Sequence, residues 1–170
     1  MAYYDRQEYE KRVGKVREIL QSRNLDFALI YYDEFNLANA WYLTGWCPQF
    51  EKGAALLPVD GEPLLLGGPE SEPFARMSSA ISETRNFPPF MVPDEEYPNA
   101  KISSFGSLSA ELKEKGVSMA AIGLVGTAAL PHNVFIQFEA GFKSRPVENT
   151  AQSESLRDLK SPWAIPNPSS

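Results

Sequence analysis

Apolar and polar residues alternate with a helical period near the start of the chain. Tyr9, Val13, Val16 and Leu20 are separated by four, three and four positions, and mostly charged residues lie between them. This spacing places the four apolar side chains on one face and predicts an amphipathic helix with a single buried stripe. Asn24 follows, and asparagine tolerates the left-handed conformation that often ends a helix.

Short segments of strand length recur through the rest of the sequence. Asp60-Gly61 lies between two apolar runs, and this dipeptide favours a hairpin turn because glycine adopts a positive φ without strain. Prolines exclude a central strand at residues 88–93 and predict an irregular loop there. The predicted strands are residues 27–32, 54–58, 63–66, 84–87 (an edge strand), 119–125 and 143–147.

Segments with a helical pattern lie between the predicted strands. Residues 104–115 end at Gly116 and residues 131–140 end at Gly141, where glycine is the favoured residue after a helix. Further short helices are predicted at residues 33–40, 70–77 and 151–159. Helices that alternate with strands, with one hairpin among them, predict an α/β fold: a single three-layer domain with a mixed sheet flanked by helices.

Composition and charge narrow the classes of function. The 170 residues are 43% hydrophobic and 12% aromatic, as in a globular protein, and carry a net charge of -6. This acidic balance disfavours both a nucleic-acid partner and an anionic membrane surface. The N-terminus lacks the apolar segment of a signal peptide, and apolar runs stay well below the about 20 residues of a membrane span. Together these features predict a cytoplasmic protein.

Few residues suit catalysis or metal binding. Cys47 is the sole cysteine and His132 the sole histidine, so the sequence offers neither a disulfide framework nor a zinc motif. We interpret Cys47 as an inert thiol and His132 as a solvated residue, and we predict no metal or cofactor on this chain. Two glycine pairs, Gly67-Gly68 and Gly123 with Gly126, follow predicted strands, but turn geometry explains them better than phosphate binding.

Residues 41–52 differ from the rest of the chain because they combine large aromatic and polar residues. Such a segment either packs under a neighbouring element or lines a contact surface. The sequence leaves both alternatives open. The residues concerned include Trp41, Tyr42, Trp46, Phe50, Glu51 and Lys52.

Residues 9–66 resemble the N-terminal domain shared by creatinase, Xaa-Pro aminopeptidase and Xaa-Pro dipeptidase (prolidase). The resemblance rests on the leading helix, then N-L-D-F-A-L-I at 24–30, N-A-W-Y-L-T-G-W at 39–46 and the Asp60-Gly61 hairpin, in this order. L-R-D-L-K-S-P-W at 156–163 is similar to the segment that leads into the family's pita-bread catalytic domain. Ala164 departs from the family, which usually has Glu there. We therefore expect residues 1–160 to form the domain, and residues 161–170 to be a tail where a linker would start.

The resemblance implies a ribonuclease H-like layout and a non-catalytic role. The family binds two divalent metal ions in its catalytic domain, which this sequence does not contain, so the resemblance implies that the chain alone is inactive. It also implies a homodimer, in which Trp46, Phe50 and Lys52 contribute to a subunit contact and to the rim of a neighbour's substrate pocket. A peptide or guanidino-type substrate would bind only together with a catalytic domain.

The sequence is compatible with two other hypotheses. One is a free-standing binding or assembly module derived from that domain, and the other is an independent small enzyme that acts through its glycine-containing loops. The sequence does not distinguish a truncated piece from a natural short protein, nor a peptidase from a creatinase-type parent.

Overall fold

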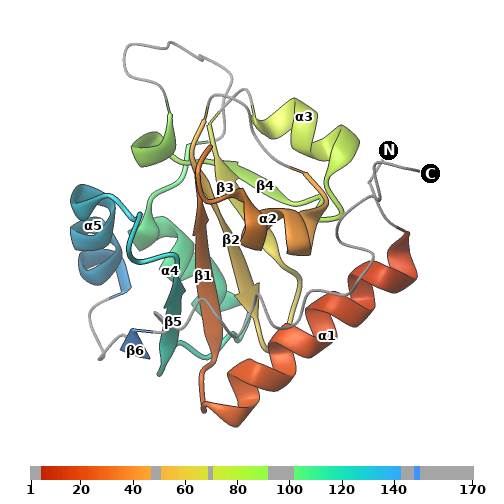
Figure 1. Ribbon diagram of the computed structural model, residues 1–170. Coiled ribbons are helices and arrows are strands. Elements are labelled where there is room, and N and C mark those ends of the chain that lie inside the picture. Colours follow the sequence, from red (N-terminus) through yellow and green to blue (C-terminus); the bar gives the residue numbers. More distant parts are fainter. Residues whose placement is uncertain (1–4, 47–50, 69–70, 92–101, 143–147, 150–170) are drawn as a thin grey trace.

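The computed structural model describes residues 5–46, 51–68, 71–91, 102–142 and 148–149 (Figure 1). Its helices and strands follow the alternating order that the sequence predicts. The helices are α1 (Arg6–Ser22), α2 (Leu37–Thr44), α3 (Ser71–Ser78), the 3₁₀ helix η1 (Pro88–Phe90), α4 (Phe105–Glu114) and α5 (His132–Phe142). The strands are β1 (Phe27–Tyr32), β2 (Gly53–Pro58), β3 (Leu64–Gly67), β4 (Thr84–Asn86), β5 (Ile122–Val125) and β6 (Glu148–Asn149).

The six strands form one mixed sheet in the order β4-β3-β2-β1-β5-β6. Strand β2 runs antiparallel to both of its neighbours, β1 and β3, whereas the other neighbouring strands are parallel. Helices α1, α2 and α3 cover one face of the sheet, and α4 and α5 cover the other (Figure 1). The predicted three-layer α/β fold with a mixed sheet is therefore confirmed.

Strand β1 lies at the centre of both hydrophobic cores. Its even-numbered residues, such as Ile30, pack towards α1 and α2, and its odd-numbered residues, such as Leu29, pack towards α4 and α5. Successive side chains of a strand point to opposite faces, so a strand covered on both faces must be apolar throughout. This burial explains the uninterrupted apolar run that predicts β1.

Helix α1 buries the predicted stripe, since Tyr9, Val13, Val16 and Leu20 are each at most 4% exposed. The Asp5 carboxylate caps its N-terminus by accepting a hydrogen bond of 2.8 Å from the amide of Glu8. Asn24 has φ 54°, which confirms the predicted left-handed end of the helix.

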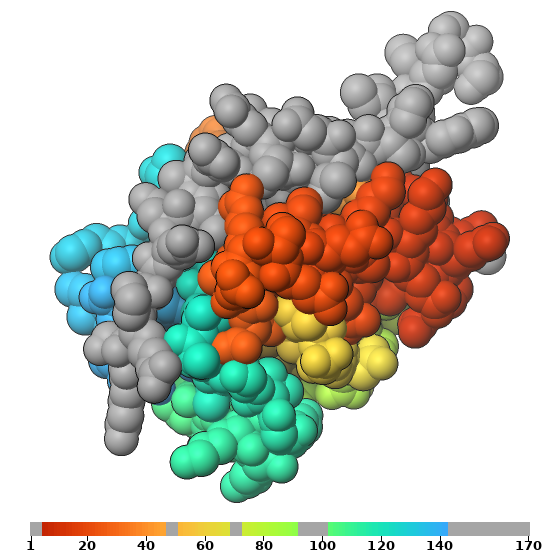
Figure 2. Space-filling view, turned by 90° about the horizontal axis from the view of Figure 1, so that it is seen from below, coloured from red at the N-terminus to blue at the C-terminus, as the bar shows by residue number. Residues whose placement is uncertain are grey.

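The β2–β3 hairpin turns at Gly61, whose φ of 113° confirms the predicted glycine turn. Arg17 of α1 fixes this turn by donating hydrogen bonds to the carbonyls of Pro58 and Gly61. Viewed from below, the yellow hairpin turn lies against the red-orange segment around α1 (Figure 2). Helix α1 and the hairpin are therefore joined by hydrogen bonds from a side chain to the backbone as well as by packing in the core.

Some boundaries differ from the prediction. Helix α2 extends to Thr44, so the first part of the aromatic segment is helical. Gly141 lies inside α5 instead of ending it. A glycine is required there because α4 packs so closely that a Cβ would lie 2.4 Å from Phe105 Cβ. Strand β5 begins at Ile122 and is shorter than predicted. The predictions for residues 143–147, 151–159 and 161–170 fall outside the described residues.

Candidate functional site

The segment between α2 and β2 begins with a tightly bonded turn. Gly45 ends α2 with φ 65°, a conformation that glycine adopts without strain. The fully buried Thr44 hydroxyl donates to the Ala40 carbonyl at 2.7 Å and accepts from the Trp46 amide at 3.0 Å. The amide of Ala80 donates to the Thr44 carbonyl at 2.8 Å. These contacts give a physical reason for the T-G-W sequence, because each residue fulfils a separate role in the turn.

Trp46 packs inwards from this turn. It is 9% exposed, and its ring meets the ring of Tyr32 edge-on at 6.5 Å with an interplanar angle of 89°. Tyr32 is the last residue of β1, and its side chain lies against its register partner Gly53 on β2. A Cβ on Gly53 would lie 2.4 Å from the Tyr32 hydroxyl oxygen. For Trp41, Tyr42 and Trp46, the structure therefore favours packing over an exposed aromatic surface, since Trp41 is partly buried and Tyr42 is 2% exposed.

Glu51 and Lys52 lead into β2 and occupy opposite environments. Glu51 is 4% exposed, and its carboxylate lies so close to Gly68 that a Cβ there would approach Oε1 to 2.1 Å. Lys52 is exposed. The adjacent residues thus combine a buried anchor with an outward-facing cation. The sequence motifs assign Glu51 no separate role, and the only signal for one is a carboxylate two positions before an apolar strand.

The structure also accounts for the glycine pairs. The carboxylate of Glu51 fills the space next to Gly68 that an anion would need. Gly126 has φ 85°, and a Cβ there would lie 3.0 Å from the Tyr31 carbonyl oxygen. Close packing and turn geometry therefore explain both glycines, in agreement with the interpretation from sequence.

Three further candidate residues remain. Phe50 and Cys47 lie outside the described residues, and His132 is exposed at the start of α5, away from this segment. Among the described residues, no group of three or more His, Cys, Asp or Glu side chains could hold a metal ion. Each helix in the same ranges is too short or too polar to span a membrane.

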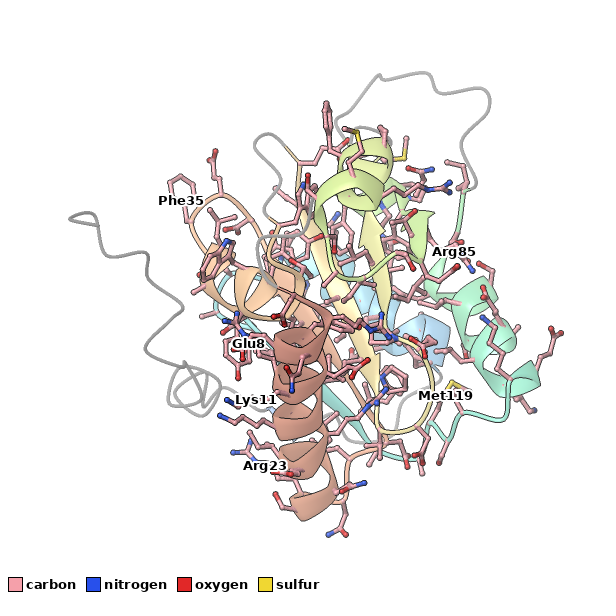
Figure 3. All side chains as sticks on the ribbon, turned by 90° about the vertical axis from the view of Figure 1, so that its right-hand side faces the viewer. Glu8, Lys11, Arg23, Phe35, Arg85 and Met119 are labelled. Carbon is pink, nitrogen blue, oxygen red and sulfur yellow. The ribbon has the colours of Figure 1, made fainter. Side chains whose placement is uncertain are left out.

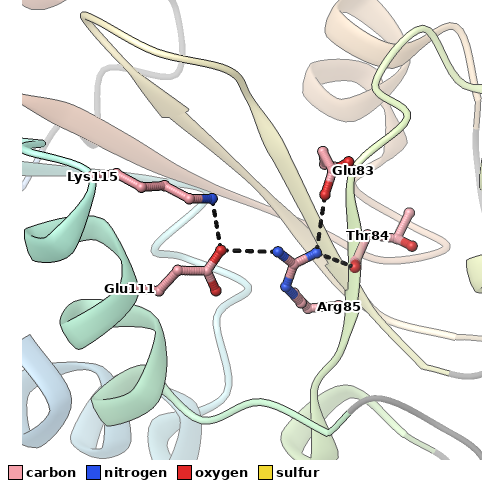
Figure 4. Close-up of polar contacts among 5 residues, drawn as sticks. All are labelled: Glu83, Thr84, Arg85, Glu111 and Lys115. Atoms are coloured by element: carbon pink, nitrogen blue, oxygen red, sulfur yellow. Dashed lines mark hydrogen bonds and ion pairs between the residues drawn. The ribbon is translucent and has the colours of Figure 1, made fainter.

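An ionic network around one buried arginine lies at a different place, between β4 and α4 (Figure 4). Arg85, whose side chain is 8% exposed, donates to Glu83 at 3.2 Å, to the Thr84 carbonyl at 2.8 Å and to Glu111 at 2.9 Å. Lys115 donates to the same Glu111 oxygen at 2.7 Å. Hydrogen bonds from Lys115 and then Arg85 hold the pKa of Glu111 below its ordinary value. Two cations face two carboxylates, so the network is electrically balanced and joins α4 to the sheet edge.

Comparison with known proteins identifies the relatives of this fold. Residues 12–158 match the family model described as the creatinase/prolidase N-terminal domain. No curated protein matches the sequence.

Three solved structures illustrate the similarity in fold. A proline dipeptidase structure from Streptococcus pneumoniae TIGR4 aligns with a TM-score of 0.62 and 17% identity over 87% of this chain and 98% of that chain. The N-terminal domain of the cytoplasmic peptidase PepQ from Mycobacterium tuberculosis H37Rv aligns with a TM-score of 0.58 and 18% identity. This alignment covers 86% of this chain and 98% of that domain. The prolidase from Pyrococcus horikoshii OT3 aligns with a TM-score of 0.59 and 15% identity. This alignment covers 88% of this chain but 34% of that prolidase.

Proposed function

This chain belongs to the creatinase/prolidase N-terminal domain family, and we propose that it serves as the non-catalytic N-terminal domain of an Xaa-Pro peptidase-like metallohydrolase. The extent of the match supports this role. The chain covers 98% of the PepQ N-terminal domain but 34% of the complete prolidase. Hydrolysis would then depend on a catalytic domain that carries the two metal ions.

The pair Glu51 and Lys52 carries the proposed contribution to substrate binding. Lys52 is exposed and directly follows the buried Glu51, so its backbone is anchored while its ammonium group faces outwards. An ammonium group forms strong, charge-assisted hydrogen bonds to a carboxylate, which a peptide substrate carries at its C-terminus. Lys52 would bind that carboxylate at the rim of a neighbour's pocket, together with Phe50.

Trp46 has a different part in this proposal. Because its ring packs against Tyr32 and its amide is bonded to Thr44, it would hold the start of the segment in place. We expect it to act on the substrate through the position of the following residues. The same family role implies a homodimer in the cytoplasm.

A kinetic experiment tests the role of Lys52. In the polypeptide that carries this domain together with its catalytic domain, Lys52→Ala should raise KM for Xaa-Pro dipeptides about tenfold, the effect of losing one charge-assisted hydrogen bond. Lys113→Ala is the matched control, because Lys113 is also exposed but lies on α4. Unchanged KM and kcat in Lys52→Ala would remove Lys52 from the rim.

A second measurement tests the non-catalytic role itself. The 170-residue chain, assayed with Xaa-Pro dipeptides and added Mn²⁺ or Zn²⁺, should release no proline above the rate without protein. Turnover that survives purification and depends on the chain's concentration would contradict the proposal and favour an independent enzyme.

A further inference from the structure

A cleft of about 410 Å³ lies between the β2–β3 hairpin turn and the end of α4. It is lined by residues within 58–64, 83–85 and 111–117, and we call it the hairpin cleft. Strands β3 and β4 are parallel, so the turn before β3 and the residues before β4 meet at the same edge of the sheet. Lys52 precedes β2 whereas the hairpin turn follows it, so the cleft and Lys52 lie at opposite edges. Its volume suits a small organic molecule, since ligand pockets usually measure about 300–1,000 Å³.

Much of the lining of the hairpin cleft is apolar. Leu64 of β3 and Leu112 of α4 line it and are 7% and 6% exposed, and the partly buried Val117 packs against the same core. Pro58 and Pro63 line the cleft as well. A lining of this kind favours a ligand with an apolar group, because binding removes that group from water.

The hairpin side of the cleft carries uncompensated negative charge. Asp60 and Glu62 line it, both are exposed, and neither has an ion-pair partner among the residues that the structure describes. Arg17 is bonded to the same turn, but it donates to the carbonyls of Pro58 and Gly61. Over the whole lining, four carboxylates stand against two cations. The cleft therefore attracts a cation and repels an anion.

The opposite side of the cleft contributes a hydrogen-bond donor. Arg85, which is 8% exposed, reaches from β4 towards α4 (Figure 3) and lines the cleft. Its two Nη atoms donate to Glu83, to Glu111 and to the Thr84 carbonyl. Its Nε is buried and has no acceptor among the described residues. Leaving a buried donor unpaired costs free energy, so an acceptor atom of a ligand that reached Nε would be stabilised there.

We propose that the hairpin cleft binds a small organic amine that carries an apolar group and a hydrogen-bond acceptor. The ammonium group of this ligand lies beside Asp60 and Glu62. Its apolar group contacts Leu64 and Leu112, and its acceptor faces Arg85. Each of these features is common on a protein surface by itself, but here all of them line one cleft of suitable volume. The site is separate from the proposed rim residues and needs no catalytic domain.

An NMR titration of the 170-residue chain with leucinol tests this site. Leucinol combines an ammonium group, a branched apolar group and a hydroxyl group. The amide resonances of residues 58–64 and 111–117 should shift with a Kd on the order of 1 mM, as expected for so small a ligand. Isohexanol keeps the apolar and hydroxyl groups without the charge and should bind about fivefold more weakly. Isopentylamine lacks the hydroxyl acceptor and should bind about threefold more weakly.

Two substitutions test the position of the ammonium group. Asp60→Asn keeps a favoured turn, because Asn-Gly suits a hairpin as well as Asp-Gly does, and Glu62→Gln keeps the length of the side chain. The double variant should raise the Kd of leucinol about fivefold and leave that of isohexanol unchanged. Glu18→Gln is the control, because Glu18 is exposed on α1 and does not line the cleft. Amide spectra of the free variants check that the fold is retained.

Several results would overturn the proposal. They are unchanged amide resonances in saturating leucinol, shifts confined to other parts of the chain, equal affinity for leucinol and isohexanol, and an unchanged Kd in the double variant. Equal affinity for leucinol and isopentylamine would remove the acceptor at Arg85. None of these results bears on the kinetic effect of Lys52→Ala, so failure of this inference and failure of the proposed function can be told apart.

Discussion

Arg12 and Tyr42 are joined at two points. Arg12 Nη1 donates a hydrogen bond of 3.0 Å to the Tyr42 carbonyl, and the guanidinium carbon lies 5.0 Å from the centroid of the Tyr42 ring. Arg12 Nε also contacts Glu8 at 2.8 Å, and the Arg12 side chain is 3% exposed. Helix α1 is thereby fixed to α2, the helix that ends in the T-G-W turn.

Removing this link should destabilise the domain. Arg12→Ala removes the buried donor to the Tyr42 carbonyl, and we expect it to lower the free energy of unfolding by about 1–3 kcal/mol. Arg12→Lys should recover part of the loss, because lysine keeps the charge but not the planar group that stacks on the ring. Urea unfolding measures the free energy of unfolding of both variants. Arg6→Ala is the control, since its pair with Glu10 is 68% and 61% exposed and its loss should leave the unfolding curve close to that of the wild-type chain.

Asp26, within the N-L-D-F-A-L-I sequence, should prove structural. Its Oδ2 accepts a hydrogen bond of 2.8 Å from the Ala121 amide, and its own amide donates to the Ala121 carbonyl at 2.8 Å. Asp26→Ala should therefore lower the free energy of unfolding by about 1–2 kcal/mol. Hydrogen exchange should show faster opening at the start of β5 than in the control variant Glu18→Ala, which changes an exposed residue of α1. Equal exchange in the two variants would refute this role.

Two helical glycines should respond oppositely to the same substitution. A Cβ on Gly14 would meet nothing within 4 Å, so Gly14→Ala should stabilise the domain by about 0.5–1 kcal/mol through helix propensity. A Cβ on Gly141 would lie 2.4 Å from Phe105 Cβ, so Gly141→Ala should cost about 1–3 kcal/mol by overpacking. Thermal unfolding under one set of conditions compares the pair. A shift of the same sign in both variants would contradict the packing of α4 on α5.

Stability at acid pH should depend on Glu111. Its pKa in the folded state lies below the ordinary value, first because of Lys115 and then because of Arg85. A carboxyl group with a depressed folded-state pKa stabilises the fold fully above its unfolded pKa, and that contribution is lost as the pH falls through the folded pKa. Between about pH 5 and pH 3 the wild-type chain should lose more stability than Glu111→Gln. Glu114→Gln, an exposed change on the same helix, should follow the wild-type curve.

The sequence predicts an element best where the local pattern of apolar residues agrees with the burial of that element. The bounds of β1 were predicted to the residue, because all six of its residues are buried and the apolar run ends where the strand ends. The aromatic segment was harder to interpret. Its first residues are helical and pack inwards, since α2 contacts both β1 and α1 and is apolar on much of its surface. Periodicity becomes weak when a helix is buried on several sides.

The candidate site was predicted only in part. Family motifs indicated the segment that contains Trp46 and Lys52, but they did not distinguish the inward-facing tryptophan from the exposed lysine. No motif indicates the role of Glu51, because its partner surface at Gly68 is distant in sequence. The same holds for Arg85, which pairs with Glu111 of another element. Long-range polar contacts leave no periodic signal in a single chain.

The sequence by itself determined the family, the three-layer α/β fold and the glycine turn at Gly61, because each depends on local spacing, turn chemistry or a run of apolar residues. Tertiary structure alone decided what each side chain faces. It brought the starts of β3 and β4 to one edge of the sheet, and so placed Glu62 and Glu83 in the lining of one cleft with Glu111 of α4. The physical reason is strand direction, because hydrogen-bond pairing between distant segments fixes which loops share an edge.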